Sequence, residues 1–138
     1  MNKLFSSDEI YSHLEGTRKA LVVEDNFILS LLYENSLKEL VFNTVGEISD
    51  AETAVELVKE HDPALVIMDI VLDGKRDGID AAEAIRTFSN VPILFVTGNS
   101  DKHHFERAKQ IQNSDFLRKP VTEHSLTEAV KVLLKKQG

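Results

Sequence analysis

Residues 64–69 read Ala64-Leu65-Val66-Ile67-Met68-Asp69, an apolar run followed directly by an acid. A short continuous apolar run is typical of a strand that is buried on both faces of a parallel sheet. The carboxylate of Asp69 then stands at the point where the buried strand ends and the chain meets solvent. This stretch predicts the strongest strand of the fold and a reactive group at its end.

Three other apolar runs also lead to chemically useful side chains, which supply carboxylates, a hydroxyl and an amine. These are Glu24 and Asp25 after residues 20–23, Thr97 after residues 93–96, and Lys119 shortly after Phe116-Leu117. Because the carboxyl ends of parallel strands gather at one edge of an open sheet, we expect all of these groups to share one site.

The apolar runs alternate with longer stretches of helical periodicity, a pattern typical of repeated strand–helix units. We predict an α/β protein with a flavodoxin-like fold, a doubly wound parallel sheet of five βα units with strand order 2-1-3-4-5. The expected strands are 19–24, 43–47, 64–69, 93–96 and 115–117. The expected helices are 26–40, 50–61, 79–88, 101–110 and one that begins at Thr122.

The first of these helices has an apolar face that we expect to pack on the core. Its members are Phe27, Ile28, Leu31, Leu32, Leu37 and Leu40.

Length and composition limit the classes of function. The chain of 138 residues is long enough for one domain with a full core, which we place at 19–138, after an extension, 1–18, that forms a short helix or a tail. The formal charge of −7 opposes direct DNA binding. The absence of cysteine excludes disulfides and thiolate metal sites. With no signal-peptide pattern and no membrane-spanning run, we expect a cytoplasmic protein without membrane contact.

Carboxylates that converge at neighbouring strand ends repel one another unless a cation shares the site. Glu24, Asp25 and Asp69 offer only oxygen ligands, and no histidine or cysteine stands beside them in the sequence. Oxygen ligands suit a hard ion that retains several waters. We therefore expect Mg²⁺ rather than zinc.

A carboxylate can accept a phosphoryl group when a metal ion and a fixed cation neutralise the oxygen charge that develops. Asp69 is the candidate acceptor. Lys119 supplies the positive charge, and the hydroxyl of Thr97 can donate a hydrogen bond to a phosphoryl oxygen. Each residue type thus has a distinct chemical role.

Over residues 18–136 the sequence resembles the receiver domain of two-component response regulators. The segments that carry this resemblance are Leu21-Val22-Val23-Glu24-Asp25-Asn26, Val66-Ile67-Met68-Asp69, Asp77-Gly78, the stretch from Val91-Pro92-Ile93 to Thr97-Gly98, and Phe116-Leu117-Arg118-Lys119-Pro120. The segments occur in the order that the family requires, and their combination is specific.

The resemblance implies a phosphorelay function. Asp69 would accept the phosphoryl group from a sensor histidine kinase or a histidine phosphotransfer protein. Together with Asp69, the residues Glu24 and Asp25 and the main-chain carbonyl of Val71 would hold Mg²⁺. Lys119 would pair with the phosphoryl group, and a cis peptide bond would precede Pro120.

The resemblance also implies a route for the signal. Thr97 and Phe116 would act as the switch pair, and Val71 and Asn99 would tune dephosphorylation. A protein partner would read the signal on the face formed by helix 101–110, strand 115–117 and the last helix, which is also a candidate homodimer interface. We expect a signalling receiver that catalyses only its own phosphotransfer and slow dephosphorylation, and that stands alone because no output domain follows residue 136.

Three alternatives remain open. A pseudo-receiver would bind partners without being phosphorylated, and the unusual charged loop 72–77 is the reason to consider this hypothesis. An aspartyl-phosphate phosphatase of the haloacid dehalogenase type would need an acid where Val71 stands. A flavodoxin-like flavin-binding module would give no reason for the pair Glu24-Asp25. We interpret His103-His104 as solvated helix residues rather than as a metal site, since adjacent residues do not share a helix face.

Overall fold

The computed structural model describes residues 18–98 and 102–137, and it confirms the predicted α/β architecture. A parallel sheet of five strands has the order β2-β1-β3-β4-β5. The strands are β1 (Lys19–Val23), β2 (Asn43–Ile48), β3 (Leu65–Asp69), β4 (Ile93–Thr97) and β5 (Ser114–Arg118). The extension expected at 1–18 lies outside the described residues, apart from Arg18.

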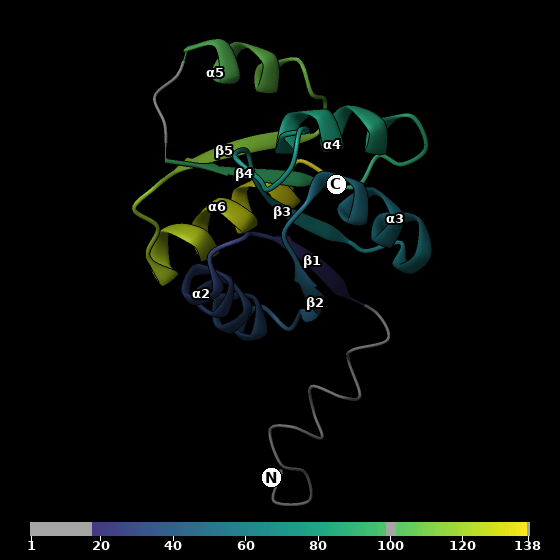
Figure 1. Cartoon of the computed structure of the whole chain (residues 1–138). Helices are drawn as coiled ribbons and strands as arrows, with labels where there is room; N and C mark the ends of the chain where they lie inside the picture. Colours follow the sequence, from purple (N-terminus) through teal and green to yellow (C-terminus); the bar gives the residue numbers. More distant parts are fainter. Residues whose placement is uncertain (1–17, 99–101, 138) are drawn as a thin grey trace, which may run out of the picture.

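The helices cover both faces of this sheet (Figure 1). On one face, α2 (Phe27–Glu39) and α6 (Glu123–Lys135) pack over a core that contains Val22, Ile67 and Leu94. On the other face, α3 (Ala51–His61), α4 (Gly78–Arg86) and α5 (Lys102–Lys109) enclose a second core. Strands β3 and β4 are buried along their whole length, which explains their continuous apolar sequences.

Polar residues fix the starts of four helices. The side chains of Asn26, Asp50, Asp77 and Thr122 each accept a hydrogen bond from a backbone N–H of the first turn. The helix starts predicted at Asp50 and Thr122 are thus confirmed, whereas the start expected at Asp101 lies outside the described residues. At Asp77 the cap is reciprocal, because the carboxylate of Asp80 accepts from the Asp77 N–H at 2.9 Å.

The prediction that Phe27, Ile28 and Leu31 face the core is wrong. Their exposed fractions are 57%, 75% and 41%, whereas the buried side of α2 carries Ser30, Tyr33, Ser36 and Leu37. Apolar residues surround much of this helix, so its sequence does not identify one core-facing stripe. The buried face is selected by packing against β1 and α6, and three large apolar side chains remain at the surface near the start of α2.

No helix among residues 18–98 and 102–137 is both long enough and apolar enough to cross a membrane.

Candidate functional site

The predicted acids come together at the carboxyl edge of the sheet. Glu24 follows β1 and Asp69 ends the neighbouring strand β3, and both residues are only 4% exposed. Asp25 is exposed beside them. One carboxylate oxygen from each of the three residues lies within 4.8 Å of the others. The register of two adjacent parallel strands thus produces an acidic cluster that opens to solvent through Asp25.

Backbone groups orient the two buried carboxylates. The Asn26 N–H donates to Oε2 of Glu24 at 3.2 Å, and the Val71 N–H donates to Oδ1 of Asp69 at 3.3 Å. The N–H of Glu24 itself donates to the carbonyl of Ile48 in β2 at 3.0 Å. One oxygen of each carboxylate is therefore held by the chain, and the other faces the interior of the site.

Lys119 supplies the positive charge at this point. Its Nζ lies 3.3 Å from Oδ2 of Asp69 and 3.4 Å from Oε1 of Glu24. The peptide bond between Lys119 and Pro120 is cis, as predicted, and the Lys119 N–H donates to the carbonyl of Thr97 at 2.8 Å. A Cβ at Gly98 would stand 3.3 Å from Cδ of Lys119, so the glycine leaves room for the lysine side chain.

One lysine does not neutralise the acids. Burial and, after it, the neighbouring Asp69 carboxylate together raise the pKa of Glu24 from 4.5 to about 7, although Asn26 and Lys119 act in the opposite direction. Oε1 of Glu24 is buried and accepts no hydrogen bond from the described residues. An unsatisfied oxygen in a cluster of three carboxylates fits a hard divalent cation, so the donor set is suited to Mg²⁺.

The loop after Asp69 is held against the site by a close backbone contact. The Gly78 N–H donates to the carbonyl of Ile70 at 2.7 Å. A Cβ on Gly78 would lie 2.1 Å from the carbonyl oxygen of Asp69, so only glycine fits here. The start of α4 is consequently attached directly to the backbone of the candidate acceptor.

Thr97 and Phe116, the predicted switch pair, lie on the neighbouring strands β4 and β5. Thr97 ends β4 and is 7% exposed. Phe116 lies on the adjacent strand β5, partly buried, with its ring centroid 6.0 Å from that of Phe95 and 5.0 Å from that of Phe105 on α5. The aromatic contacts connect the edge strand to α5 next to the candidate site.

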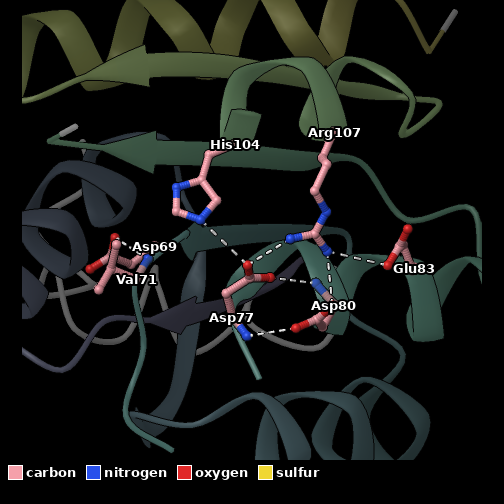
Figure 2. Close-up of polar contacts among 7 residues, drawn as sticks. All are labelled: Asp69, Val71, Asp77, Asp80, Glu83, His104 and Arg107. Atoms are coloured by element: carbon pink, nitrogen blue, oxygen red, sulfur yellow. Dashed lines mark hydrogen bonds and ion pairs between the residues drawn. The ribbon is translucent and has the colours of Figure 1, made fainter. Parts of the chain in front are cut away.

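An ionic clasp also joins α5 to the start of α4, and Figure 2 shows its members. Arg107 of α5 donates from Nη1 to Oδ2 of Asp77 at 2.9 Å and from Nη2 to Oδ1 of Asp80 at 2.8 Å. The backbone N–H of Asp77, with Arg107 in addition, holds the pKa of Asp80 below its ordinary value. Since Asp77 precedes Gly78, the clasp connects α5 to the loop that begins at Asp69.

The sequence did not predict this clasp, nor a role for Tyr33, which is fully buried on α2. His103 is exposed, as predicted, whereas His104 is only partly solvated. Its ring is partly buried, and Nε2 lies 3.7 Å from Oδ2 of Asp77 (Figure 2). Asn99 lies outside the described residues. The roles expected for the Val71 carbonyl and for the Val71 side chain in dephosphorylation remain predictions.

Comparison with known proteins identifies the family. The sequence model of the response regulator receiver domain family matches residues 20–131. The transcriptional regulatory protein PdtaR of Mycobacterium tuberculosis is 36% identical over 115 residues, which are 83% of this chain and 56% of that protein. The chemotaxis protein CheY of Halobacterium salinarum is 30% identical over 118 residues, which are 85% of this chain and 97% of that protein. The chain thus spans about half the length of the first of these relatives.

Solved structures agree with the sequence comparison. The signal receiver domain of a modulated diguanylate cyclase from Desulfovibrio desulfuricans has a TM-score of 0.78 at 29% identity, over 86% of this chain and 94% of that one. A response regulator receiver protein from Sinorhizobium medicae has a TM-score of 0.77 at 27% identity, over 88% of this chain and 97% of that one. Both have the fold described above.

The pKa of Glu24 leads to a stability prediction for the metal-free protein. The folded state binds this proton more tightly than the unfolded chain, so the free energy of unfolding decreases as pH rises from about 4.5 to about 7. We expect Glu24→Gln to raise the free energy of unfolding by about 1 to 3 kcal/mol at pH 8 and by much less at pH 5. Urea denaturation in the presence of a chelator measures this.

Glu60→Gln, which changes an exposed acid on α3, is the matched control and should leave the pH dependence unchanged. A Glu24→Gln protein that is no more stable than the wild type at pH 8 would contradict the electrostatic account of this cluster.

Proposed function

The chain belongs to the response regulator receiver domain family, and from that membership we propose that Asp69 accepts a phosphoryl group from a phosphohistidine on a partner protein. Phosphorylation-dependent signalling is the general role of this family. The observation that carries the proposal is the position of Asp69, with Oδ2 3.3 Å from the ammonium of Lys119 and Glu24 and Asp25 beside it.

The transfer is a displacement at phosphorus. An oxygen of the Asp69 carboxylate attacks the phosphorus atom, the new P–O bond forms as the P–N bond to the donor histidine breaks, and the imidazole leaves with the electron pair of that bond. The hydrogen bond from the Val71 N–H orients the attacking carboxylate. Lys119 then pairs with a phosphoryl oxygen instead of with the free carboxylate.

Glu24, Asp25 and Asp69, together with the Val71 carbonyl, would hold Mg²⁺ in this function. When bound, the ion would neutralise negative charge on the carboxylates and on the phosphoryl oxygens. The raised pKa and the unsatisfied oxygen of Glu24 support this assignment.

The negative charge of the phosphoryl group on Asp69 changes the surface formed by α5, β5 and α6. In our proposal the hydroxyl of Thr97 moves to donate to a phosphoryl oxygen, and Phe116 turns into the space that Thr97 leaves. The ring of Phe105 packs against that of Phe116 in a tilted arrangement, so a movement of Phe116 alters the packing of α5. The face formed by α5, β5 and α6 then presents a different surface to a downstream protein or to a second copy of the chain.

The Arg107 clasp opposes this change. Arg107 fixes α5 to the cap of α4, and α4 is attached to the Asp69 backbone through Gly78. A displacement of α5 stretches the clasp. The clasp therefore favours the unphosphorylated arrangement and sets how much of the active arrangement exists before phosphorylation.

The exposed apolar residues at the start of α2 are suited to binding the phosphodonor. Phe27 lines the same surface depression as Glu24 and Asp25. Ile28 and Leu31 continue the apolar surface along α2, and Val71, 56% exposed, lies two residues after Asp69. A donor protein that brings its phosphohistidine to Asp69 has to cover this region, so we propose these residues as the donor-docking patch.

Phosphorylation itself is the first test. With acetyl phosphate and Mg²⁺, we expect the intact mass of the wild type to increase by one phosphoryl group, in an adduct that is labile to base. Asp69→Asn should abolish the adduct, because the amide is not a nucleophile. Asp73→Asn, in the loop just beyond Asp69, is the control and should still be modified. If the wild type takes no phosphate from acetyl phosphate or from a kinase, the pseudo-receiver function replaces this proposal.

Ile28→Lys tests the docking patch. The variant should accept phosphate from acetyl phosphate at the wild-type rate and from a phosphorylated histidine kinase about tenfold more slowly, since a central interface residue is typically worth 1 kcal/mol or more. Val132→Lys places the same change on an exposed apolar residue of α6 and should leave both rates unchanged. Equal slowing with both donors would mean that the lysine disturbs the site itself, against the docking proposal.

Arg107→Met tests the clasp. Loss of a partly buried ion pair is worth about 1 kcal/mol, which shifts the ratio of active to inactive protein about fivefold. Without phosphate, the backbone NMR resonances of Thr97 and Phe116 should move toward their positions in the beryllofluoride complex. The control Arg76→Met breaks an exposed pair with Glu52 and should leave them in place. Resonances that stay at their wild-type positions in Arg107→Met would rule out the clasp as a restraint on the switch.

A further inference from the structure

Tyr33 is a buried polar residue that the proposed phosphotransfer does not use. It lies on α2, is 0% exposed, and belongs to the core on the α2 and α6 side of the sheet. Its ring fills space that a phenylalanine ring would fill as well. The hydroxyl therefore needs its own explanation, because a buried hydroxyl without a partner costs about 1 to 3 kcal/mol.

Two buried polar atoms in this region are unsatisfied. No hydrogen bond among the described residues involves Oη of Tyr33, and none reaches Oε1 of Glu24. Lys119 approaches Oε1 at 3.4 Å as an ion pair, without a hydrogen bond. One of the two atoms carries a proton to donate, and the other is a carboxylate oxygen that can accept it.

Tyr33 belongs to the same core cluster as Val22 of β1, and Glu24 directly follows that strand, so the fold brings the two groups to the same end of β1. The electrostatics agree with this placement. Burial is the main cause that raises the pKa of Tyr33 above its usual range, and the charges of Glu24 and Asp69 raise it further. Oε2 of Glu24 already accepts from the Asn26 N–H, so Oε1 is the oxygen that remains to be satisfied, and its two lone pairs can serve both a hydroxyl donor and a cation.

We infer that Tyr33 is a positioning residue, whose hydroxyl donates a hydrogen bond to Oε1 of Glu24 and holds this carboxylate in place as a ligand for Mg²⁺. The inference rests on the proposed Mg²⁺ site. A ligating carboxylate is usually supported by hydrogen bonds from outside the metal's own ligand set, and loss of such a partner typically weakens metal binding 10- to 100-fold.

The assignment also gives α2 a second function. The same helix carries the docking patch on its outer side and Tyr33 on its buried side. The Asn26 N–H at its start holds Oε2, and Tyr33, in its second turn, holds Oε1. Glu24 is thus fixed by the helix that follows it rather than by the strand alone.

The test compares two variants that each remove one buried hydroxyl from α2. Tyr33→Phe removes the proposed donor, and Ser36→Ala removes a hydroxyl that donates only to the Leu32 carbonyl at 2.9 Å. Isothermal titration with Mg²⁺ should show about tenfold weaker binding for Tyr33→Phe and less than a twofold change for Ser36→Ala. Wild-type affinity in Tyr33→Phe, or an equal loss in both variants, would overturn the inference.

A spectroscopic signature supplies a second readout that a purely structural role would not produce. The chain has two tyrosines and no tryptophan, so Tyr11→Phe leaves Tyr33 as the only tyrosine fluorophore. Mg²⁺ should raise its emission with the midpoint found by calorimetry, because a metal-bound carboxylate accepts the hydroxyl proton less strongly. Unchanged emission would contradict the inference, whereas a wild type that binds no Mg²⁺ would first overturn the proposed metal site.

Discussion

The site depends on the repulsion between carboxylates that the parallel sheet forces together. Strands β1 and β3 are neighbours in register, so the acids at their ends, Glu24 and Asp69, are buried side by side. Lys119 offsets part of this charge, while burial and the neighbouring Asp69 raise the pKa of Glu24. A site with excess negative charge binds a divalent cation readily and responds to any group that changes its charge. In our proposal, metal binding, phosphoryl acceptance and switching all follow from this excess of negative charge.

A series of side-chain and backbone contacts links Asp69 to the surface formed by α5 and β5. Gly78 packs on the Asp69 carbonyl and bonds to the next residue, Ile70. Arg107 joins α5 to α4, and Phe105 of α5 packs against Phe116. These contacts form a continuous path from the acceptor to the face that α5 shares with β5. Tightly packed helices and strands have few alternative arrangements. A change of charge at Asp69 is therefore expected to favour one arrangement of α4, α5 and β5 over another.

Much of this could be predicted from the sequence, because apolar runs identify buried strands and their ends identify the shared edge. The strand ends alone indicate Glu24, Asp25, Asp69 and Thr97 as site residues. Helix α2 shows its limit, since apolar side chains cover most of the helix and only tertiary packing selects the buried face. Contacts between distant segments, such as the Arg107 clasp, leave no periodic signal, and neither does the hydroxyl of a core tyrosine such as Tyr33.

The central claim is that the strand-end acids form a Mg²⁺-dependent phosphoacceptor site. A crystal structure of the protein with Mg²⁺ and beryllofluoride tests it most directly. The account predicts beryllofluoride attached to a carboxylate oxygen of Asp69 and close to Lys119, with Mg²⁺ beside Glu24 and Asp25. A structure grown at saturating concentrations of both compounds in which Asp69 carries no adduct, or in which the cation binds away from these acids, would contradict the claim.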